Sequence, residues 1–152
     1  MSLPAFDGRS NYRVLEGDRD WKPFNHLDGF DYKILDVDVT RRTVDMLFRF
    51  EPDGVCFYHR HRSAVLAFVL EGEHHIEEID DQGARVKKVR RAGELAYSID
   101  GHPHIEGGGA QGGVIYFSFR GTDDHIYDIL DEDLNLVREV SIHDFRKAYE
   151  QW

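Results

Sequence analysis

Most of this chain is a succession of short runs in which β-branched and aromatic residues alternate with polar ones. Such alternation is typical of half-buried strands, because successive side chains of a strand point to opposite faces of a sheet. Residues that favour turns separate the runs, as at Asp53-Gly54, Glu71-Gly72, Asp100-Gly101 and Asp131 to Asp133. The runs at residues 43–50, 55–61 and 125–130 are among those that predict strands. About nine or ten short strands at this regular spacing predict an all-β sandwich or barrel.

Only the end of the sequence has the pattern of a helix. Ser141 and Asp144 have the spacing of an N-terminal capping box. Ile142, Phe145 and Tyr149 then recur near helical spacing, which predicts one apolar stripe. The expected architecture is therefore all-β with a short C-terminal helix.

The runs show neither an internal repeat nor a linker, so we predict one domain. Residues 1–29 lack alternation and are expected to form an arm that packs on the barrel. The barrel itself is expected over residues 30–140, and the helix over residues 141–152. These boundaries follow from where the alternation begins and ends.

Charge and cysteine content narrow the class of protein. Among 152 residues, 19 Lys and Arg stand against 29 Asp and Glu, which gives a formal net charge of −10. So acidic a chain is unsuited to bind nucleic acid or an anionic membrane through its net charge. The one cysteine, Cys56, excludes an intrachain disulfide and fits a reducing compartment. No stretch is long and apolar enough for a membrane span, and no signal peptide is evident, so we expect a cytoplasmic protein.

Three of the nine histidines form a candidate metal site. His59 and His61 are two residues apart on a predicted strand and therefore project from the same face. His104 follows the turn at Gly101, and closure of the sheet into a barrel would bring it to the other two. Neutral imidazole nitrogens are common ligands of transition metals. The alternative is that the three are surface or hydrogen-bonded histidines.

The glycines around these histidines carry a resemblance to a known family. The stretch from Gly54 to His61, followed by Gly72, resembles the first motif of the cupin superfamily. Gly93, Gly101 and His104 resemble its second motif. The length and the single pair of motifs are most similar to the acetylacetone-cleaving dioxygenases and to the cupins related to the ChrR regulator. The resemblance implies a single jelly-roll-type barrel with a divalent metal held by His59, His61 and His104.

One departure from the cupin pattern concerns the metal. The glutamate that usually follows the second histidine is replaced by Val65 or Leu66, neither of which can bind a cation. Three neutral ligands would leave the ion its full positive charge. His102 and Glu106 flank His104, but we expect neither to be a ligand: Pro103 implies a turn, and the glycines after Glu106 predict a loop.

The resemblance implies an enzyme with Fe(II), O2 and a small-molecule substrate. A three-histidine Fe(II) site with open positions would suit a dioxygenase that cleaves a carbon–carbon bond in a dicarbonyl or hydroxyketone. Zinc, nickel or copper would also suit three imidazoles. The alternatives are a zinc-binding sensor without turnover, a metal-dependent isomerase or lyase, and a degenerate cupin that binds no metal.

Three further residues are candidate catalytic groups. His75 and Glu77 share one face of their predicted strand, and the resemblance would turn that face into the barrel. His75 would then serve as a base or substrate partner, and His102 is expected to face the substrate. An exposed polar strand face is the alternative. Ala67, Glu77 and Ser98 stand where the diketone-cleaving enzymes would have a tyrosine, an arginine and a glutamate, which weakens the assignment of a diketone substrate.

Two surface features bear on partners. Arg85, Lys87, Lys88, Arg90 and Arg91 alternate with valines and predict a solvated strand face, or else a contact with an anionic partner or a second subunit. The acidic C-terminal hairpin and its amphipathic helix are of a kind that packs across a neighbouring copy. We therefore expect a homodimer.

Overall fold

The computed structural model describes residues 20–99 and 101–152; residues 1–19 of the arm predicted over residues 1–29 lie outside this part of the chain. The described elements are β1 (Lys22–Pro23), the 3-10 helix η2 (Phe24–His26), β2 (Phe30–Asp38), β3 (Thr43–Phe50), β4 (His59–His61), β5 (Ser63–Ile79), β6 (Arg85–Arg91), β7 (Leu95–Ser98), β8 (His104–Gly121), β9 (His125–Leu130), β10 (Leu136–Ser141) and α1 (Ile142–Glu150). The prediction of an all-β chain with a short terminal helix is confirmed.

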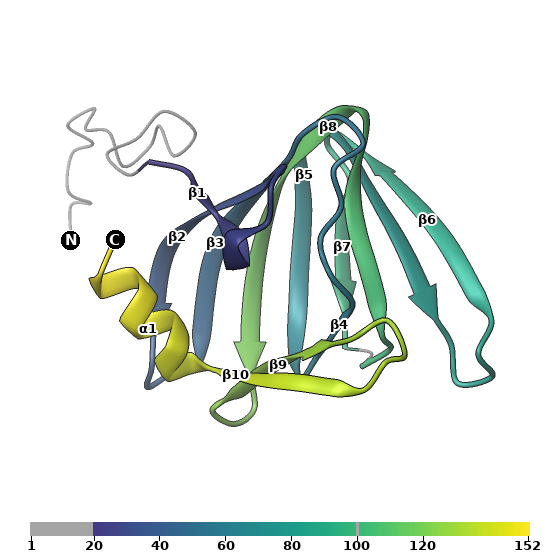
Figure 1. Cartoon of the computed structure of the whole chain (residues 1–152). Helices are drawn as coiled ribbons and strands as arrows, with labels where there is room; N and C mark the ends of the chain where they lie inside the picture. The colour runs from purple at the N-terminus through teal and green to yellow at the C-terminus, as the bar shows by residue number, and fades with distance from the viewer. Residues whose placement is uncertain (1–19, 100) are drawn as a thin grey trace, which may run out of the picture.

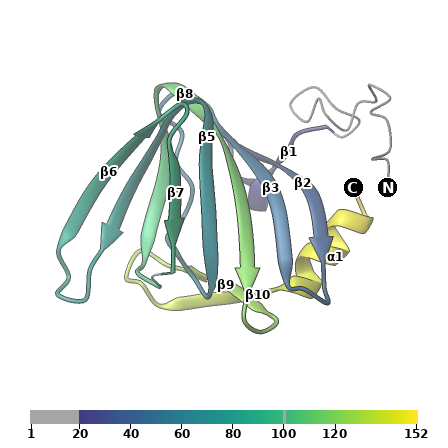
Figure 2. The same cartoon turned by 180° about the vertical axis from the view of Figure 1, so that it is seen from behind.

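The strands form one strongly curled sheet that makes a half-barrel (Figure 1). Its path runs β1-β2-β3-β8-β4-β9-β10, and β5 pairs with β6, β7 and β8. Every pairing in it is antiparallel. Seen from behind, β5 and β8 run side by side along the back of the sheet (Figure 2). These two long strands therefore connect the two halves of the molecule.

The segment from Ser63 to Ile79 is one bent strand, whereas the sequence predicts two strands separated by a turn at Gly72. The register with β8 shifts on both sides of Gly72, which marks β-bulges. Gly72 has φ +65°, and a Cβ atom there would lie 2.2 Å from the carbonyl oxygen of Gly112. The bulges reverse which side chains point inward: Val69 is buried before them, and His74 and Ile76 are buried after them.

The glycine-rich stretch after Glu106 is also a strand, and the prediction of a loop there is wrong. A Cβ atom on Gly107 would lie 2.6 Å from the carbonyl oxygen of Gly54, and one on Gly113 would lie 2.2 Å from that of Glu73. The glycines therefore allow neighbouring backbones to approach closely where the sheet bends. As a result, β8 is continuous from His104 to the apolar run that ends at Phe119.

Local turn chemistry fixes the C-terminal helix. Ser141 and Asp144 form the predicted capping box, in which the Ser141 side chain accepts from the Asp144 amide and Asp144 accepts from the Ser141 amide. Ile142 and Phe145 are buried, and α1 packs against β2 at one end of the half-barrel (Figure 1). Neither α1 nor the other described helix is long and apolar enough to cross a membrane.

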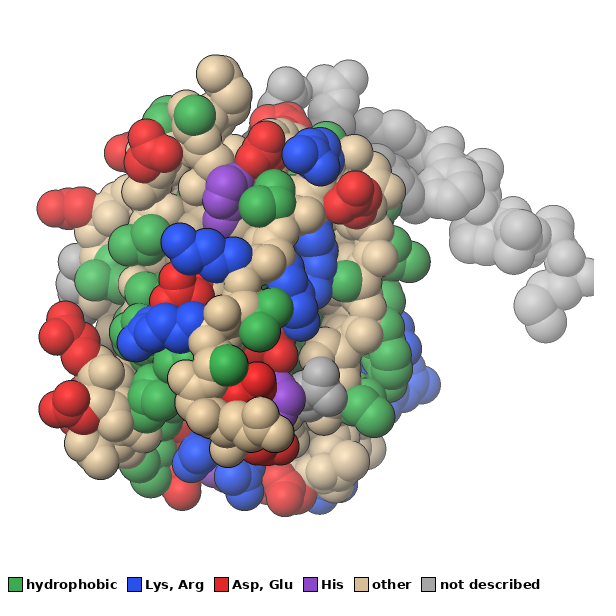
Figure 3. Space-filling view, turned by 90° about the vertical axis from the view of Figure 1, so that its right-hand side faces the viewer, with side chains coloured by type: hydrophobic (Ala, Val, Ile, Leu, Met, Phe, Trp, Pro, Cys, Tyr) green, Lys and Arg blue, Asp and Glu red, His purple; other side chains and the backbone are tan. Residues whose placement is uncertain are grey.

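Three of the five basic residues on β6 form ion pairs within the chain. Glu77 on β5 forms ion pairs with Arg85 (2.6 Å) and Lys87 (3.8 Å), and Glu78 forms one with Lys88 (3.0 Å). Basic and acidic side chains accordingly lie beside one another on the side of the molecule that carries β6 (Figure 3). These pairs favour the interpretation of a solvated strand face.

Candidate metal centre

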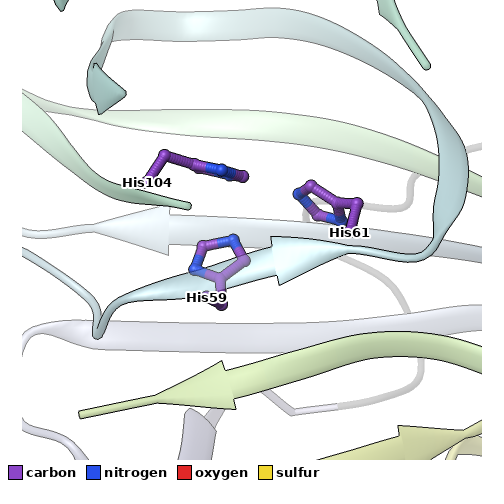
Figure 4. Close-up of side chains that lie close together, drawn as sticks. All are labelled: His59, His61 and His104. Carbon is purple, nitrogen blue, oxygen red and sulfur yellow. The ribbon is translucent and has the colours of Figure 1, made fainter. Parts of the chain in front are cut away.

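The three histidines predicted as ligands lie together inside the half-barrel (Figure 4). The short strand β4 carries His59 and His61 between β8 and β9, and His59 pairs directly with His104 of β8. One ring nitrogen from each histidine lies within 4.8 Å of those of the other two. The predicted strand from Val55 to His61 is shorter than expected, since only its last three residues form β4. Those three include both histidines.

Hydrogen bonds orient two of the rings toward the centre. The Nδ1 atom of His59 donates to the carbonyl oxygen of Phe57 (3.0 Å), and that of His104 donates to the carbonyl oxygen of His102 (2.9 Å). Each ring is thereby held with its Nε2 atom available for another partner. Metal-binding histidines are typically fixed in this way through the nitrogen that does not bind the metal.

The His61 ring contains a buried polar atom that has no hydrogen-bond partner among the described residues. Nδ1 of His61 is buried and makes no hydrogen bond within the described part of the chain. An unsatisfied buried polar atom is costly, and a cation bound at this Nδ1 atom itself would remove that cost. The donor set and the orientations of His59 and His104 fit a divalent transition metal, for which imidazole nitrogens lie at about 2.0–2.1 Å in zinc sites.

A carboxylate that sequence reasoning set aside lies against the same histidines. Glu106 is two residues after His104 and projects from the same face of β8. Its Oε2 atom is 3.3 Å from Nε2 of His59, and its Oε1 atom accepts a hydrogen bond from Nε2 of His74 (2.9 Å). The sequence contains this signal as the spacing of Glu106 from His104. The glycines that follow conceal it, because in sequence they resemble a loop.

When no cation is bound, the pKa values of the three histidines shift in different directions. Burial lowers the pKa of His59, but hydrogen bonds with Cys56 and Glu106 outweigh burial and hold that pKa well above its usual range. Burial and the neighbouring imidazoles hold the pKa of His61 well below its usual range, and burial lowers the pKa of His104 to about 4. His61 and His104 therefore stay neutral, as metal ligands must.

Glu106 is ionised in this environment. Burial raises the pKa of its carboxyl group, but hydrogen bonds from His59 and His74 reverse the effect and hold that pKa well below its usual range. A negative charge therefore lies beside His59 and His104.

A small pocket of about 40 Å³ opens onto the centre, enough for about three water molecules. Apolar side chains including Val65, Ala67 and Phe117 line its wall, and Glu78, Arg90, Ser98 and His102 are its polar members. Arg90 makes no ion pair with any residue that the structure describes. The sequence did not predict Arg90 at the pocket, because the basic run from Arg85 to Arg91 has the pattern of a solvated strand face. The register of β6 explains it, since Arg90 pairs with the inward-facing His74.

The expectation that His75 and Glu77 face the barrel interior is wrong. The bulges at Gly72 turn His74 and Ile76 inward instead. His75 donates to Glu73 (2.6 Å) on the outer face, where Glu77 binds Arg85. Glu77 therefore faces away from the three histidines.

His102 lies where a substrate-facing residue would be. It lines the pocket, and its Nδ1 atom is 2.9 Å from Oε1 of Glu78. Its carbonyl oxygen orients His104, as described above. A catalytic role for the His102 side chain remains a prediction.

Comparisons with solved structures support the fold. The chain is similar to a putative acetylacetone dioxygenase from Methylibium petroleiphilum (TM-score 0.68, 19% identity, 86% of this chain and 88% of that one). It is also similar to an acetylacetone dioxygenase from Acinetobacter johnsonii (TM-score 0.68, 12% identity, 99% and 91%). A variant of the oxalate decarboxylase from Bacillus subtilis matches with a TM-score of 0.56 and 18% identity over 62% of this chain. The chain spans only 26% of that decarboxylase.

Sequence comparison supplies the family. No curated protein matches the chain. The family profile described as the ChrR cupin-like domain matches residues 10–122, which include both histidine motifs and all but the last part of the half-barrel. The chain therefore belongs to the ChrR cupin-like family of cupins.

Proposed function

We propose that this protein is a non-haem Fe(II) dioxygenase that cleaves a carbon–carbon bond of a small dicarbonyl or hydroxyketone. The observation that carries the proposal is the convergence of His59, His61 and His104, of which His61 and His104 line a small pocket. The acetylacetone dioxygenases among the structural neighbours give the reaction class. Iron, when bound, would supply Lewis-acid activation of the substrate and reaction with O2.

The side chains around the centre suit a small substrate with an anionic oxygen. The pocket admits only a few non-hydrogen atoms. Phe117 and Val65 exclude water from its wall, which strengthens electrostatic interactions inside it. Arg90, which also lines the pocket, offers hydrogen-bond donors to an enolate or carboxylate oxygen. We also propose a reducing compartment, such as the cytoplasm, because Cys56 is buried and unpaired.

Metal analysis and oxygen uptake test this proposal. Untagged protein would be assayed for bound metals, loaded with Fe(II), and given a panel of 1,3-diketones, hydroxyketones and 2-oxo acids in an oxygen electrode. We expect one panel class to consume O2 in proportion to its cleavage, and His61→Ala to abolish uptake. Tight zinc without turnover would instead identify a sensor, and turnover that is unchanged without O2 would identify an isomerase or lyase. Either result would overturn the dioxygenase proposal.

A further inference from the structure

We propose that Glu106 is a fourth ligand of the bound cation and that His74 is the residue that positions it. This inference rests on the proposed metal site but not on the dioxygenase reaction. It assigns the carboxylate of the centre to β8, whereas the cupin pattern takes its glutamate from the segment that holds Val65 and Leu66 here.

The distances place the carboxylate beside two of the three histidine ligands. Glu106 oxygens lie 3.3 Å from Nε2 of His59 and 3.9 Å from Nε2 of His104. Two ligands that each lie about 2.1 Å from one ion are about 3 to 3.5 Å apart at the angles of octahedral and tetrahedral sites. A cation bound at Nε2 of His59 would therefore lie within reach of Glu106. Cys56, His59 and Glu106 also place one potential ligand atom each within 4.8 Å of one another.

The carboxylate of Glu106 is buried and therefore needs a partner that compensates its negative charge. The Glu106 side chain is only 8% exposed, and an ionised carboxylate at such a site is costly unless it is paired or binds a metal. Its partners among the described residues are the histidines themselves. A divalent cation would compensate the charge more fully than hydrogen bonds from these histidines can.

His74 holds the carboxylate from behind. Its side chain is completely buried, and its Nε2 atom donates to Oε1 of Glu106. Nδ1 of His74 makes no hydrogen bond within the described part of the chain, so Glu106 is the polar contact that accounts for a histidine at this position. Such a partner fixes the orientation of a ligand and raises its basicity.

The backbone of Glu106 is fixed as well. Its amide donates to Sγ of Cys56 (3.3 Å), and its carbonyl oxygen accepts from the amide of Cys56 (2.8 Å). The carboxylate is therefore held at the centre before a cation arrives. With it, the ion and its four ligands carry a net charge of +1, instead of the +2 expected from three neutral histidines.

The test compares metal affinity and ligand geometry in matched variants. Zn²⁺ and Co²⁺ affinities would be measured by chelator competition, and the ligand set would be followed by the absorption spectrum of the Co²⁺ form. We expect Glu106→Gln to weaken both metals at least 100-fold and to change the Co²⁺ spectrum. His74→Phe should weaken them about tenfold and keep the spectrum, as loss of a positioning partner does. Glu77→Gln, on the outer face, should leave both readouts unchanged.

The other outcomes of this experiment contradict either the assignment of Glu106 as a ligand or the three-histidine site. Wild-type metal affinity in Glu106→Gln would overturn the inference. Weaker binding with an unchanged Co²⁺ spectrum would also overturn it, because Glu106 would then only orient His59 and would not bind the metal. If Glu106→Gln fails to fold by circular dichroism, Glu106→Asp keeps the charge and must still alter the spectrum. His61→Ala separates the two proposals, because metal retention in that variant would refute the three-histidine site itself.

Discussion

The Nε atom of Arg60 donates to Oδ2 of Asp128 over 2.8 Å, on the face of β4 opposite His59 and His61. Asp128 is 1% exposed, and it also accepts from His125 (2.6 Å). Because β4 has only three residues, this pair anchors the short strand to β9. The residue between the two histidines thus fixes the strand that presents them.

Removal of Asp128 should therefore weaken both the fold and the metal site. We expect Asp128→Ala to lower the free energy of unfolding by about 1–3 kcal/mol, because buried hydrogen bonds to a charged group are lost. Urea denaturation of the metal-free protein measures this change. Metal affinity should fall as well, since His59 and His61 lose their fixed strand. Asp131→Ala, in the exposed turn after β9, is the control, and an equal loss of metal affinity there would contradict the argument.

The three histidines should be individually necessary for metal binding. We expect His59→Ala, His61→Ala and His104→Ala each to reduce bound metal from about one ion per chain to a trace, because two remaining imidazoles hold an ion weakly. His102→Ala should keep the full complement, because its contact with His104 is through the backbone. Elemental analysis after dialysis provides the measurement. Full retention in any of the first three variants would remove that residue from the site.

Arg90 should contribute to substrate binding rather than to metal binding. Once a substrate from the panel is found, we expect Arg90→Gln to raise its KM about tenfold or more, because a charge-assisted hydrogen bond is lost. The metal content should not change. Lys87→Gln alters an exposed cation on the same strand and serves as the control. Equal KM values for wild type and Arg90→Gln would show that the guanidinium does not contact the substrate.

Without metal, the protein should be most stable near pH 6.5. Below pH 6.5, His61 and His104 bind protons in the unfolded chain but stay neutral in the folded chain, because folding lowers both of their pKa values. Stability therefore falls from pH 6.5 toward pH 4. Above pH 6.5, the folded chain keeps a proton on His59 that the unfolded chain has lost, so stability falls again as pH rises through the raised pKa.

Urea titrations in the presence of a chelator at pH 5, 6.5 and 8 would measure this dependence. His61→Gln should make the acid side less steep and leave the alkaline side in place. Greater stability at pH 5 than at pH 6.5 would contradict the assignment of neutral His61 and His104.

We also expect a homodimer to which the C-terminal hairpin contributes. The apolar stripe of α1 packs within its own chain, but Leu136 and Val137 of β10 are 50% and 64% exposed. Sedimentation analysis should find a dimer, and the double change Leu136→Glu and Val137→Glu should yield a monomer. Val86→Glu, on β6, should leave the dimer intact. A wild-type monomer, or a dimer that survives the double change, would refute the expectation.

Local patterns were sufficient for much of the fold. The runs at residues 43–50 and 125–130 match β3 and β9, because alternation reports directly which face of a strand is buried. The capping box at Ser141 and Asp144 is a contact between near neighbours in sequence, so its residues could be recognised without the tertiary structure.

Glycines caused the main errors. Alone in a sequence they suggest turns, but Gly72 and Gly107 lie within strands where another backbone approaches too closely for a side chain. The resemblance placed His75 and Glu77 on the inner face, but the bulges at Gly72 reverse the alternation and place them on the outer face. The glycines after Glu106 led to the prediction of a loop, whereas this segment is part of β8.

By itself, the sequence determined the class of fold and the pair His59 and His61, because a spacing of two on a strand fixes a common face whatever surrounds it. Only the tertiary structure decided that Glu106 and His74 belong to the centre and that Arg90 reaches the pocket. Those contacts depend on the register between distant strands and on where a bulge shifts it, and neither is encoded within any one segment.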